Sequence, residues 1–212
     1  MRRSLDLVVP PVCRHGYAMA SGMIGRDNEV EGIRAFLDAR LVEAPRALVL
    51  EGEAGIGKST LWLSAVELAR ERGLRVLSSR PAEAERELAF AGLGDLFDDV
   101  LEEVLPALPT PRQRALRVAL LVEAAQDPLD PRAVAVAVRT ALELLAEAQP
   151  LLVAVDDVQW LDPSSTAAFA FALRRTAAPM RLLLARRNGT SGLRTSSQCF
   201  PRRPSSVCRS GR

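Results

Sequence analysis

Residues 46–60 read RALVLEGEAGIGKST, and this stretch decides the fold. Its first five residues are mostly apolar, which is typical of a short buried strand in a parallel sheet. After Glu51, the eight residues Gly52–Ser59 match the pattern G-x-x-x-x-G-K-[ST] in full. Residues 58–71 then have apolar side chains at helical spacing. A strand, a glycine-rich turn and a helix in this order predict a phosphate-binding loop.

The composition of this loop suits the phosphates of ATP. Glycines let the backbone curl so that successive N–H groups point inward, and the helix N-terminus adds partial positive charge. Lys58 can place an ammonium against the β- and γ-phosphates, and the Ser59 hydroxyl is a candidate Mg²⁺ ligand. Lys58 is also the only lysine beside 27 arginines, which indicates that this position requires a compact cation. The predicted ATP-binding residues of the loop are Gly52, Glu53, Ala54, Gly55, Ile56, Gly57, Lys58, Ser59 and Thr60.

Apolar runs and amphipathic stretches alternate along the chain. Four apolar runs predict strands, at residues 46–50, 74–79, 151–155 and 181–185. Helical spacing predicts helices at residues 26–42, 58–71, 111–125, 131–148 and 162–176, and a helical pattern at the end of 81–105. The alternation predicts an α/β fold: a P-loop NTPase three-layer sandwich with a parallel sheet covered on both faces.

Helix ends are marked at three places. Asp130-Pro131 and Asp162-Pro163 each put a capping carboxylate before a proline at the first helical position. Gly73 is expected to stop the helix that begins after the glycine-rich loop. The residues after Pro131 alternate at first, as in a strand, but the length of the Ala-rich run favours a helix.

Charged residues follow two of the predicted strands. Asp156 and Asp157 follow LLVAV, and Arg186 and Arg187 follow RLLLA. Because the carboxyl ends of parallel strands meet at one edge of a sheet, these residues are expected beside the phosphate-binding loop. Asp156 is a candidate to hold Mg²⁺ through water, and Asp157 to orient or activate the attacking water. One of the arginines could sense the γ-phosphate, but a solvated pair explains them equally well.

The two ends of the chain differ from its patterned part. We divide the sequence into an unpatterned leader (1–22), the P-loop domain (23–187) and a Ser/Arg-rich tail (188–212) with five arginines and no acid. The tail is expected to be disordered, because it has too little apolar surface to offset the entropy cost of ordering. Both an out-of-frame end of a truncated gene and a basic tail that touches nucleic acid stay open.

Charge and cysteine usage restrict the function classes. Residues 1–187 hold 23 basic and 26 acidic side chains, so this part is not a basic nucleic-acid-binding domain. The three cysteines fit neither a disulfide framework nor a metal site, and the chain shows no signal peptide and no apolar run long enough to span a membrane. The expected location is the cytoplasm. Self-association or a regulatory protein partner stays open.

Five segments together resemble one family: MIGRDNEVEGI, LVLEGEAGIGKSTLW, AEAERELAFAGLGDLF, LLVAVDDVQWLDPSS and RLLLARR. Across 23–187 they are similar to the ATPase domain of the large ATP-binding LuxR-type transcriptional regulators. These are signal-transduction ATPases with numerous domains, related to the AAA+ proteins. The resemblance implies that Gly25 and Arg26 lie around the adenine and that Arg187, or Arg186, is a sensor arginine. It implies for the loop and the two aspartates the roles of Walker A and Walker B residues, with ATP and Mg²⁺ as ligands.

The sequence departs from this family in its extent. Such regulators continue into a fifth sheet strand, a winged-helix segment, helical repeats and a DNA-binding helix-turn-helix, none of which is recognisable here. The sheet is therefore expected to lack its last strand and to leave the P-loop strand as an exposed edge, with no direct DNA binding by this chain.

Three functions are compatible with these observations. The first is an ATP-binding switch of a transcription regulator that slowly converts ATP and water to ADP and phosphate. The second is a truncated, non-enzymatic remnant that binds nucleotide weakly or not at all. The third is a small P-loop kinase, which the paired aspartates and the lack of a recognisable lid or acceptor pocket disfavour.

Overall fold

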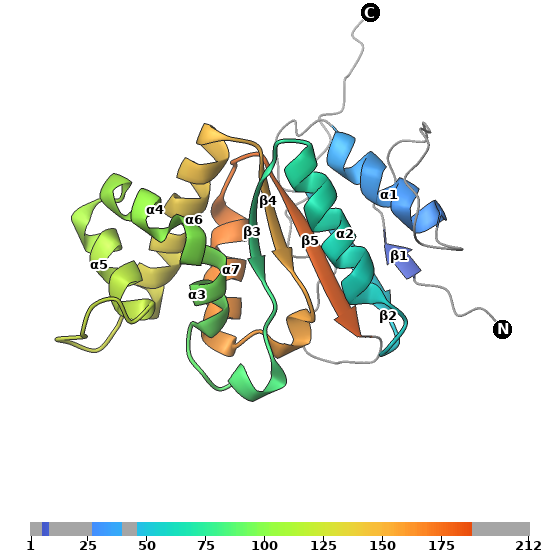
Figure 1. Cartoon of the computed structure of the whole chain (residues 1–212). Helices are drawn as coiled ribbons and strands as arrows, with labels where there is room; N and C mark the ends of the chain where they lie inside the picture. The colour runs from blue at the N-terminus through green and yellow to red at the C-terminus, as the bar shows by residue number, and fades with distance from the viewer. Residues whose placement is uncertain (1–5, 9–26, 40–45, 188–212) are drawn as a thin grey trace, which may run out of the picture.

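The computed structural model describes residues 6–8, 27–39 and 46–187, which form a sheet with helices on both faces (Figure 1). The strands are β1 (Asp6–Val8), β2 (Arg46–Gly52), β3 (Arg75–Ser79), β4 (Leu151–Val155) and β5 (Met180–Arg187). They are ordered β1-β2-β5-β4-β3, and β2, β5, β4 and β3 are parallel to one another. The predicted α/β fold with four parallel strands is confirmed.

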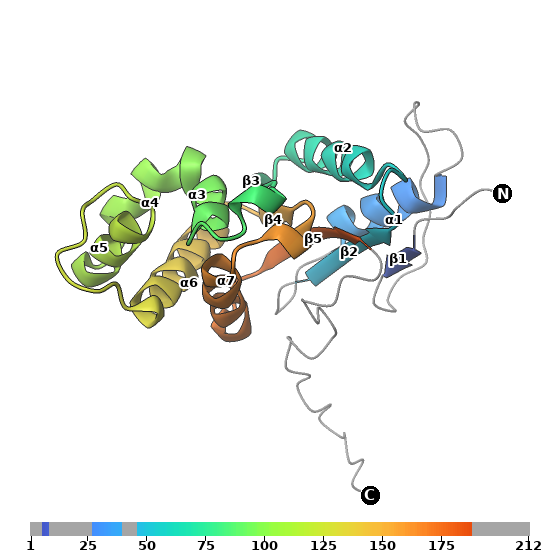
Figure 2. The same cartoon turned by 90° about the horizontal axis from the view of Figure 1, so that it is seen from below.

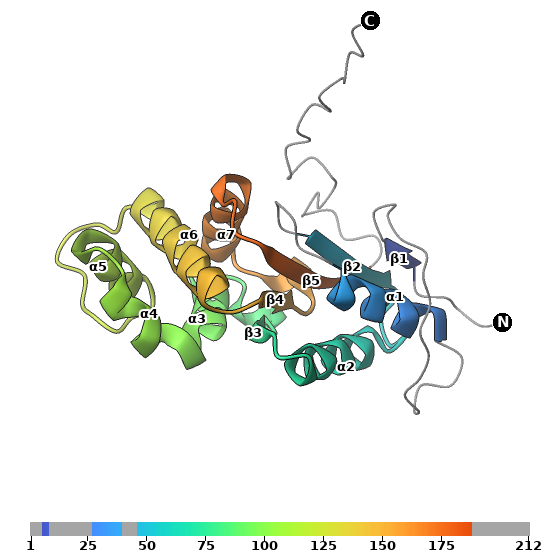
Figure 3. The same cartoon turned by 90° about the horizontal axis from the view of Figure 1, so that it is seen from above.

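Helices lie on the two sides of the sheet, as Figures 2 and 3 show from below and above. Those that pack on one face are α1 (Asp27–Asp38) and α2 (Lys58–Glu71). The other core holds α3 (Ala91–Phe97), α4 (Leu101–Ala107), α5 (Thr110–Ala119), α6 (Pro131–Ala148) and α7 (Pro163–Arg175). Short 3₁₀ turns lie at η1 (Glu83–Glu85), η2 (Asp98–Val100) and η3 (Val158–Trp160). None of the helices in the described ranges has the length and apolar content needed to cross a membrane.

Alternate side chains of the central strands point to opposite faces of the sheet and pack into the two hydrophobic cores. In β4, Leu152 and Ala154 pack with α1 and α2, whereas Leu151, Val153 and Val155 pack with the helices of the opposite face. All five residues are buried. A strand covered on both faces has no solvent-facing positions, so its sequence is continuously apolar.

The predicted helix ends at Gly73, Asp130 and Asp162 are confirmed. Gly73 follows α2 with φ +75°, a left-handed conformation that glycine adopts without steric cost. Asp130 accepts a hydrogen bond from the backbone N–H of Arg132, and Asp162 accepts one from the N–H of Ser165. Prolines occupy the first position of both helices.

The edge of the sheet beside β2 differs from the prediction. β1 pairs antiparallel with β2, with Asp6 opposite Glu51 and Val8 opposite Val49. The P-loop strand is therefore not an exposed edge, and the leader is not wholly without structure. A strand edge presents unpaired N–H and C=O groups to which any extended segment can bond. A three-residue strand is too short to produce a readable sequence pattern.

Helix α5 ends earlier than the predicted range 111–125, at a turn that places a leucine where glycine is common. The N–H of Val122 donates to the carbonyl of Arg117 (2.9 Å), and the N–H of Leu121 donates to that of Val118 (3.2 Å). These two bonds are those of a Schellman motif. Leu121 has φ +59°, and its residue surface is 89% exposed. Leucine favours helices, so the sequence contains no stop signal here.

We expect Leu121→Gly to raise the free energy of unfolding by about 1 kcal/mol, because glycine adopts a positive φ without the clash of a Cβ. Little burial is lost, since the leucine is exposed. Leu121→Ala is the control, because alanine keeps the Cβ and should leave stability nearly unchanged. Urea denaturation measures both variants. A gain of equal size with alanine would show that the backbone conformation is not the cause.

Candidate functional site

The glycine-rich loop connects β2 to α2 through two left-handed residues. Gly55 has φ +74° and Gly57 has φ +89°, values that L side chains rarely adopt. A Cβ built on Gly55 would meet no atom within 4 Å. Backbone conformation rather than crowding therefore requires glycine at this position, and the side of the loop that a Cβ would occupy is open.

Lys58 folds back over this loop. It is the first residue of α2, is 5% exposed, and its Nζ donates to the backbone carbonyl of Glu53 at 2.7 Å. Burial lowers the pKa of Lys58 below its ordinary value, and the positive charge of Arg187 acts in the same direction, whereas Asp157 and Asp156 oppose it. The only ammonium side chain of the protein is thus held at the loop, within electrostatic reach of three other charged groups.

Ser59 and Thr60 follow on the first turn of α2, where Ser59 is half-buried and Thr60 exposed. The first backbone N–H groups of a helix have no partner within the helix, so they are suited to an anion. The loop, the helix end and Lys58 therefore bring several hydrogen-bond donors close together.

The two aspartates at the end of β4 have different environments. Asp156 is 3% exposed, and its backbone N–H donates to the carbonyl of Ser79, continuing the pairing with β3. Its Oδ1 accepts the backbone N–H of Asp157 at 3.0 Å. Asp157 is half-buried, has φ +46°, and its Oδ1 accepts from Gln159 Nε2 at 2.7 Å. The left-handed residue turns the chain at the end of β4, directly before the 3₁₀ turn η3.

The two arginines, of which the resemblance put Arg187 first as the sensor, have different surroundings in the structure. The register places Arg186 opposite Glu51 and Arg187 opposite Gly52, the first residue of the loop. Arg186 forms an ion pair with Glu51. Arg187 Nη2 lies 3.5 Å from Asp157 Oδ2, with its guanidinium 5.8 Å from the ring centre of Trp160. Arg187 therefore lies beside Asp157, whereas Arg186 is paired with Glu51 on the neighbouring strand.

Sequence reasoning missed two residues of the site. Arg80 directly follows β3, and its Nε is 3.7 Å from Asp156 Oδ2. The strand-end argument that found the aspartates would also have found Arg80. Gln159 bonds Asp157 and accepts, through Oε1, the backbone N–H of Arg187 at 3.4 Å. Only the folded structure indicates Gln159, because its role depends on the contact between the short turn η3 and the end of β5.

The oxygen ligands that the protein offers suit an Mg²⁺ ion that is bound together with a nucleotide. No group of three or more His, Cys, Asp or Glu that could hold a metal ion occurs in the described part of the chain. Mg²⁺ usually takes one or two protein oxygens, phosphate oxygens and water, so the Ser59 hydroxyl and the Asp156 carboxylate fit this mode of binding. The predicted adenine residues, Gly25 and Arg26, lie outside the described residues.

A buried carboxylate fixes the segment that follows the site. Asp162 is 2% exposed and accepts the backbone N–H groups of Phe90 (2.9 Å), Gly92 (3.1 Å) and Ser165 (2.8 Å). Ser165 Oγ in turn accepts the N–H of Leu93 at 3.0 Å. The sequence predicted Asp162 only as a helix cap. In the structure it also holds the start of α3, about 70 residues away, against the chain that leaves the two aspartates.

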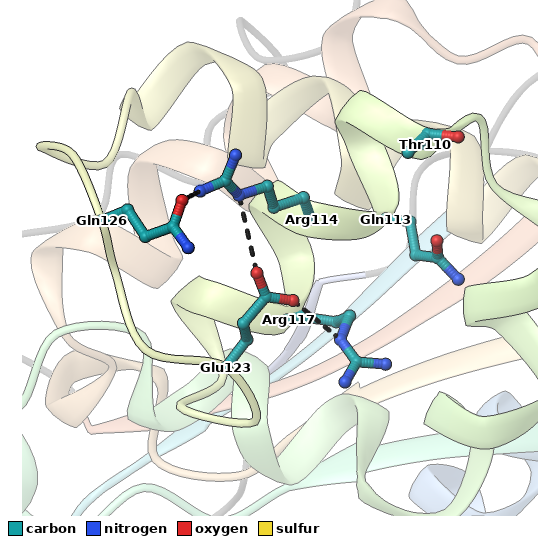
Figure 4. Close-up of a pocket in the computed structure, with 6 residues that line it drawn as sticks. All are labelled: Thr110, Gln113, Arg114, Arg117, Glu123 and Gln126. Carbon is teal, nitrogen blue, oxygen red and sulfur yellow. Dashed lines mark hydrogen bonds and ion pairs between the residues drawn. The ribbon is translucent and has the colours of Figure 1, made fainter.

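A hollow of about 440 Å³ lies away from this site, on α5 and the turn after it (Figure 4). Glu123 accepts from Arg117 at 3.2 Å and forms an ion pair with Arg114 at 3.5 Å, and Arg114 also bonds Gln126. The charges of the hollow are thus paired with one another, as in a surface ion-pair network, and give no indication of a ligand.

Comparison with known proteins supplies one family match. The family model described as the AAA ATPase domain matches residues 23–185. No curated protein sequence matches the chain significantly. Similar solved structures include Drosophila ORC bound to DNA (19% identity, TM-score 0.48, 77% of this chain and 38% of that chain). Another is AMPPCP-bound DnaA from Aquifex aeolicus (18% identity, TM-score 0.38, 82% and 43%). The chain thus spans less than half the length of these structures.

Proposed function

Since the chain belongs to the AAA ATPase domain family, we propose that it binds ATP with Mg²⁺ at Gly52–Ser59 and hydrolyses it slowly. The main support is the convergence of Lys58, Asp156, Asp157 and Arg187, which come from three separate segments of the chain. Structural ion pairs alone would not require a glycine-rich, left-handed loop at the same place.

The geometry suggests a role for each group. Lys58 can exchange the Glu53 carbonyl for a phosphate oxygen, a stronger partner because it is charged. Ser59 and Asp156 would hold Mg²⁺, which neutralises charge on the phosphate oxygens. Asp157, oriented by Gln159, is the candidate to position the attacking water. Arg187 is the candidate to contact the terminal phosphate, which would draw it away from Asp157.

We further propose that this site is the nucleotide switch of a LuxR-type transcriptional regulator, without direct DNA binding by the residues present here. The support is the five-segment sequence resemblance, because the AAA ATPase domain family is much broader than these regulators.

Equilibrium titration with a fluorescent ATP analogue, followed by measurement of phosphate release, tests the proposed function. We expect saturable binding at one site that depends on Mg²⁺, and slow phosphate release without an added acceptor. A folded sample that shows no saturable binding would instead support the non-enzymatic remnant. Transfer of the phosphoryl group to an added small molecule would support the kinase.

We expect Asp157→Asn to lower steady-state phosphate release by at least about tenfold with a much smaller change in ATP affinity. The amide keeps the shape of the side chain but loses the negative charge that orients and activates water. Asp95→Asn is the control, because Asp95 accepts a hydrogen bond from Ser79 and is not among the charged groups that shift the pKa of Lys58. Equal rates for Asp157→Asn and the wild type would exclude Asp157 from turnover.

A further inference from the structure

Arg80 is a further cation at the carboxylate assigned to Mg²⁺. The last residue of β3, Ser79, is opposite Val155 in the parallel register, so Arg80 and Asp156 leave adjacent strands side by side. The Arg80 side chain is 58% exposed, whereas that of Asp156 is 4% exposed. Their contact thus joins a cation that reaches solvent to an anion that does not.

The two oxygens of Asp156 are used differently. Oδ1 accepts the backbone N–H of Asp157, a bond that the fold supplies. Oδ2 is the oxygen that faces Arg80, at 3.7 Å from Nε. A buried carboxylate needs compensating positive charge, and Oδ2 is the oxygen that a metal ion could take without breaking a backbone bond.

We propose that Arg80 gates the metal site: its guanidinium neutralises Asp156 Oδ2 when no Mg²⁺ is present and leaves that oxygen when Mg²⁺ enters with ATP. The inference rests on the proposed function. Arginine suits the task, because it stays charged at every physiological pH and gives up a partly exposed ion pair of this length at small cost. Arg80 is therefore a positioning residue that sets how much Mg²⁺ the site requires.

The test measures the Mg²⁺ requirement for binding a fluorescent ATP analogue to the full chain, from excess EDTA to millimolar Mg²⁺. Arg80→Gln removes the competitor, so half-maximal binding should need about three- to tenfold less Mg²⁺. Arg75→Gln is the matched control: it removes the same charge from the other end of β3, where Arg75 pairs with Glu103. This control should leave the requirement unchanged.

Each result has a definite meaning. An unchanged Mg²⁺ requirement in Arg80→Gln overturns the proposal, and a higher requirement also overturns it, because Arg80 would then assist the metal-bound state. If Arg75→Gln lowered the Mg²⁺ requirement by the same factor, the loss of one positive charge anywhere on the protein would explain the effect. That result would also overturn the proposal. If the proposed ATP binding itself were wrong, the result would differ from all of these, because the wild type would show no saturable binding at any Mg²⁺ concentration.

Discussion

Lys58→Met is expected to weaken ATP binding by about 100-fold. A hydrogen bond to a charged group contributes roughly 1.5–3 kcal/mol, and each 1.4 kcal/mol is a factor of ten in affinity. Lys58 would make such bonds to the β- and γ-phosphates, and no second lysine exists anywhere in the sequence to replace it. The loss should therefore reach about two orders of magnitude.

This variant should fold as well as the wild type. Lys58 is 5% exposed and its pKa is lowered by burial, which means that the fold disfavours the charged form of this side chain. Methionine keeps the apolar stem and removes the buried charge, at the loss of one bond to the Glu53 carbonyl. We expect a melting temperature within a few degrees of the wild type, so that lost binding cannot be attributed to unfolding.

A second substitution separates charge from shape. Lys58→Arg keeps the positive charge but presents a planar fork where a single ammonium now reaches the Glu53 carbonyl. We expect weak binding in this variant too, because the buried position has to accommodate a larger group. Titration of the ATP analogue compares the three proteins. Equal affinity for Lys58→Met and the wild type would exclude Gly52–Ser59 as the binding site.

The parts of the site that depend on local pattern could be predicted from the sequence. Gly55 and Gly57 occur where the chain takes a positive φ, and Asp156 follows a continuously apolar strand. The choice between Arg186 and Arg187 could not be made in this way. Side chains alternate along a strand, so a shift of one residue in the β2–β5 register would exchange their surroundings.

Contacts between distant segments could not be predicted either. Arg181, 7% exposed in β5, donates to the backbone carbonyls of Phe36 (3.2 Å) and Ala39 (2.5 Å) at the end of α1. These bonds satisfy carbonyls that a helix C-terminus leaves without partners, across a separation of more than 140 residues. Periodicity indicates which face of a helix is apolar, but not which strand supplies the cation at its end.

The bonds from the start of α3 to Asp162 also join distant segments, and the sequence alone does not indicate them. Asp162→Ala is expected to lower the free energy of unfolding by about 3–5 kcal/mol, because it removes the acceptor for three backbone N–H groups at once. A buried donor left without a partner costs about 1–3 kcal/mol. Phe90 adds to the loss, since its left-handed conformation (φ 65°) relies on this bond to hold it.

Asp130→Ala provides a matched control within the same protein. Both aspartates precede a proline and cap a helix, but Asp130 accepts one exposed backbone N–H, from Arg132. Its loss should cost about 1 kcal/mol, the usual value for an N-cap. Guanidinium denaturation compares the two variants, and similar losses would mean that Asp162 is merely a helix cap. If the difference is as large as expected, the bonds to Phe90 and Gly92 account for it. The segment AFAGLGDLF would then help to fix the chain that leaves Asp156 and Asp157.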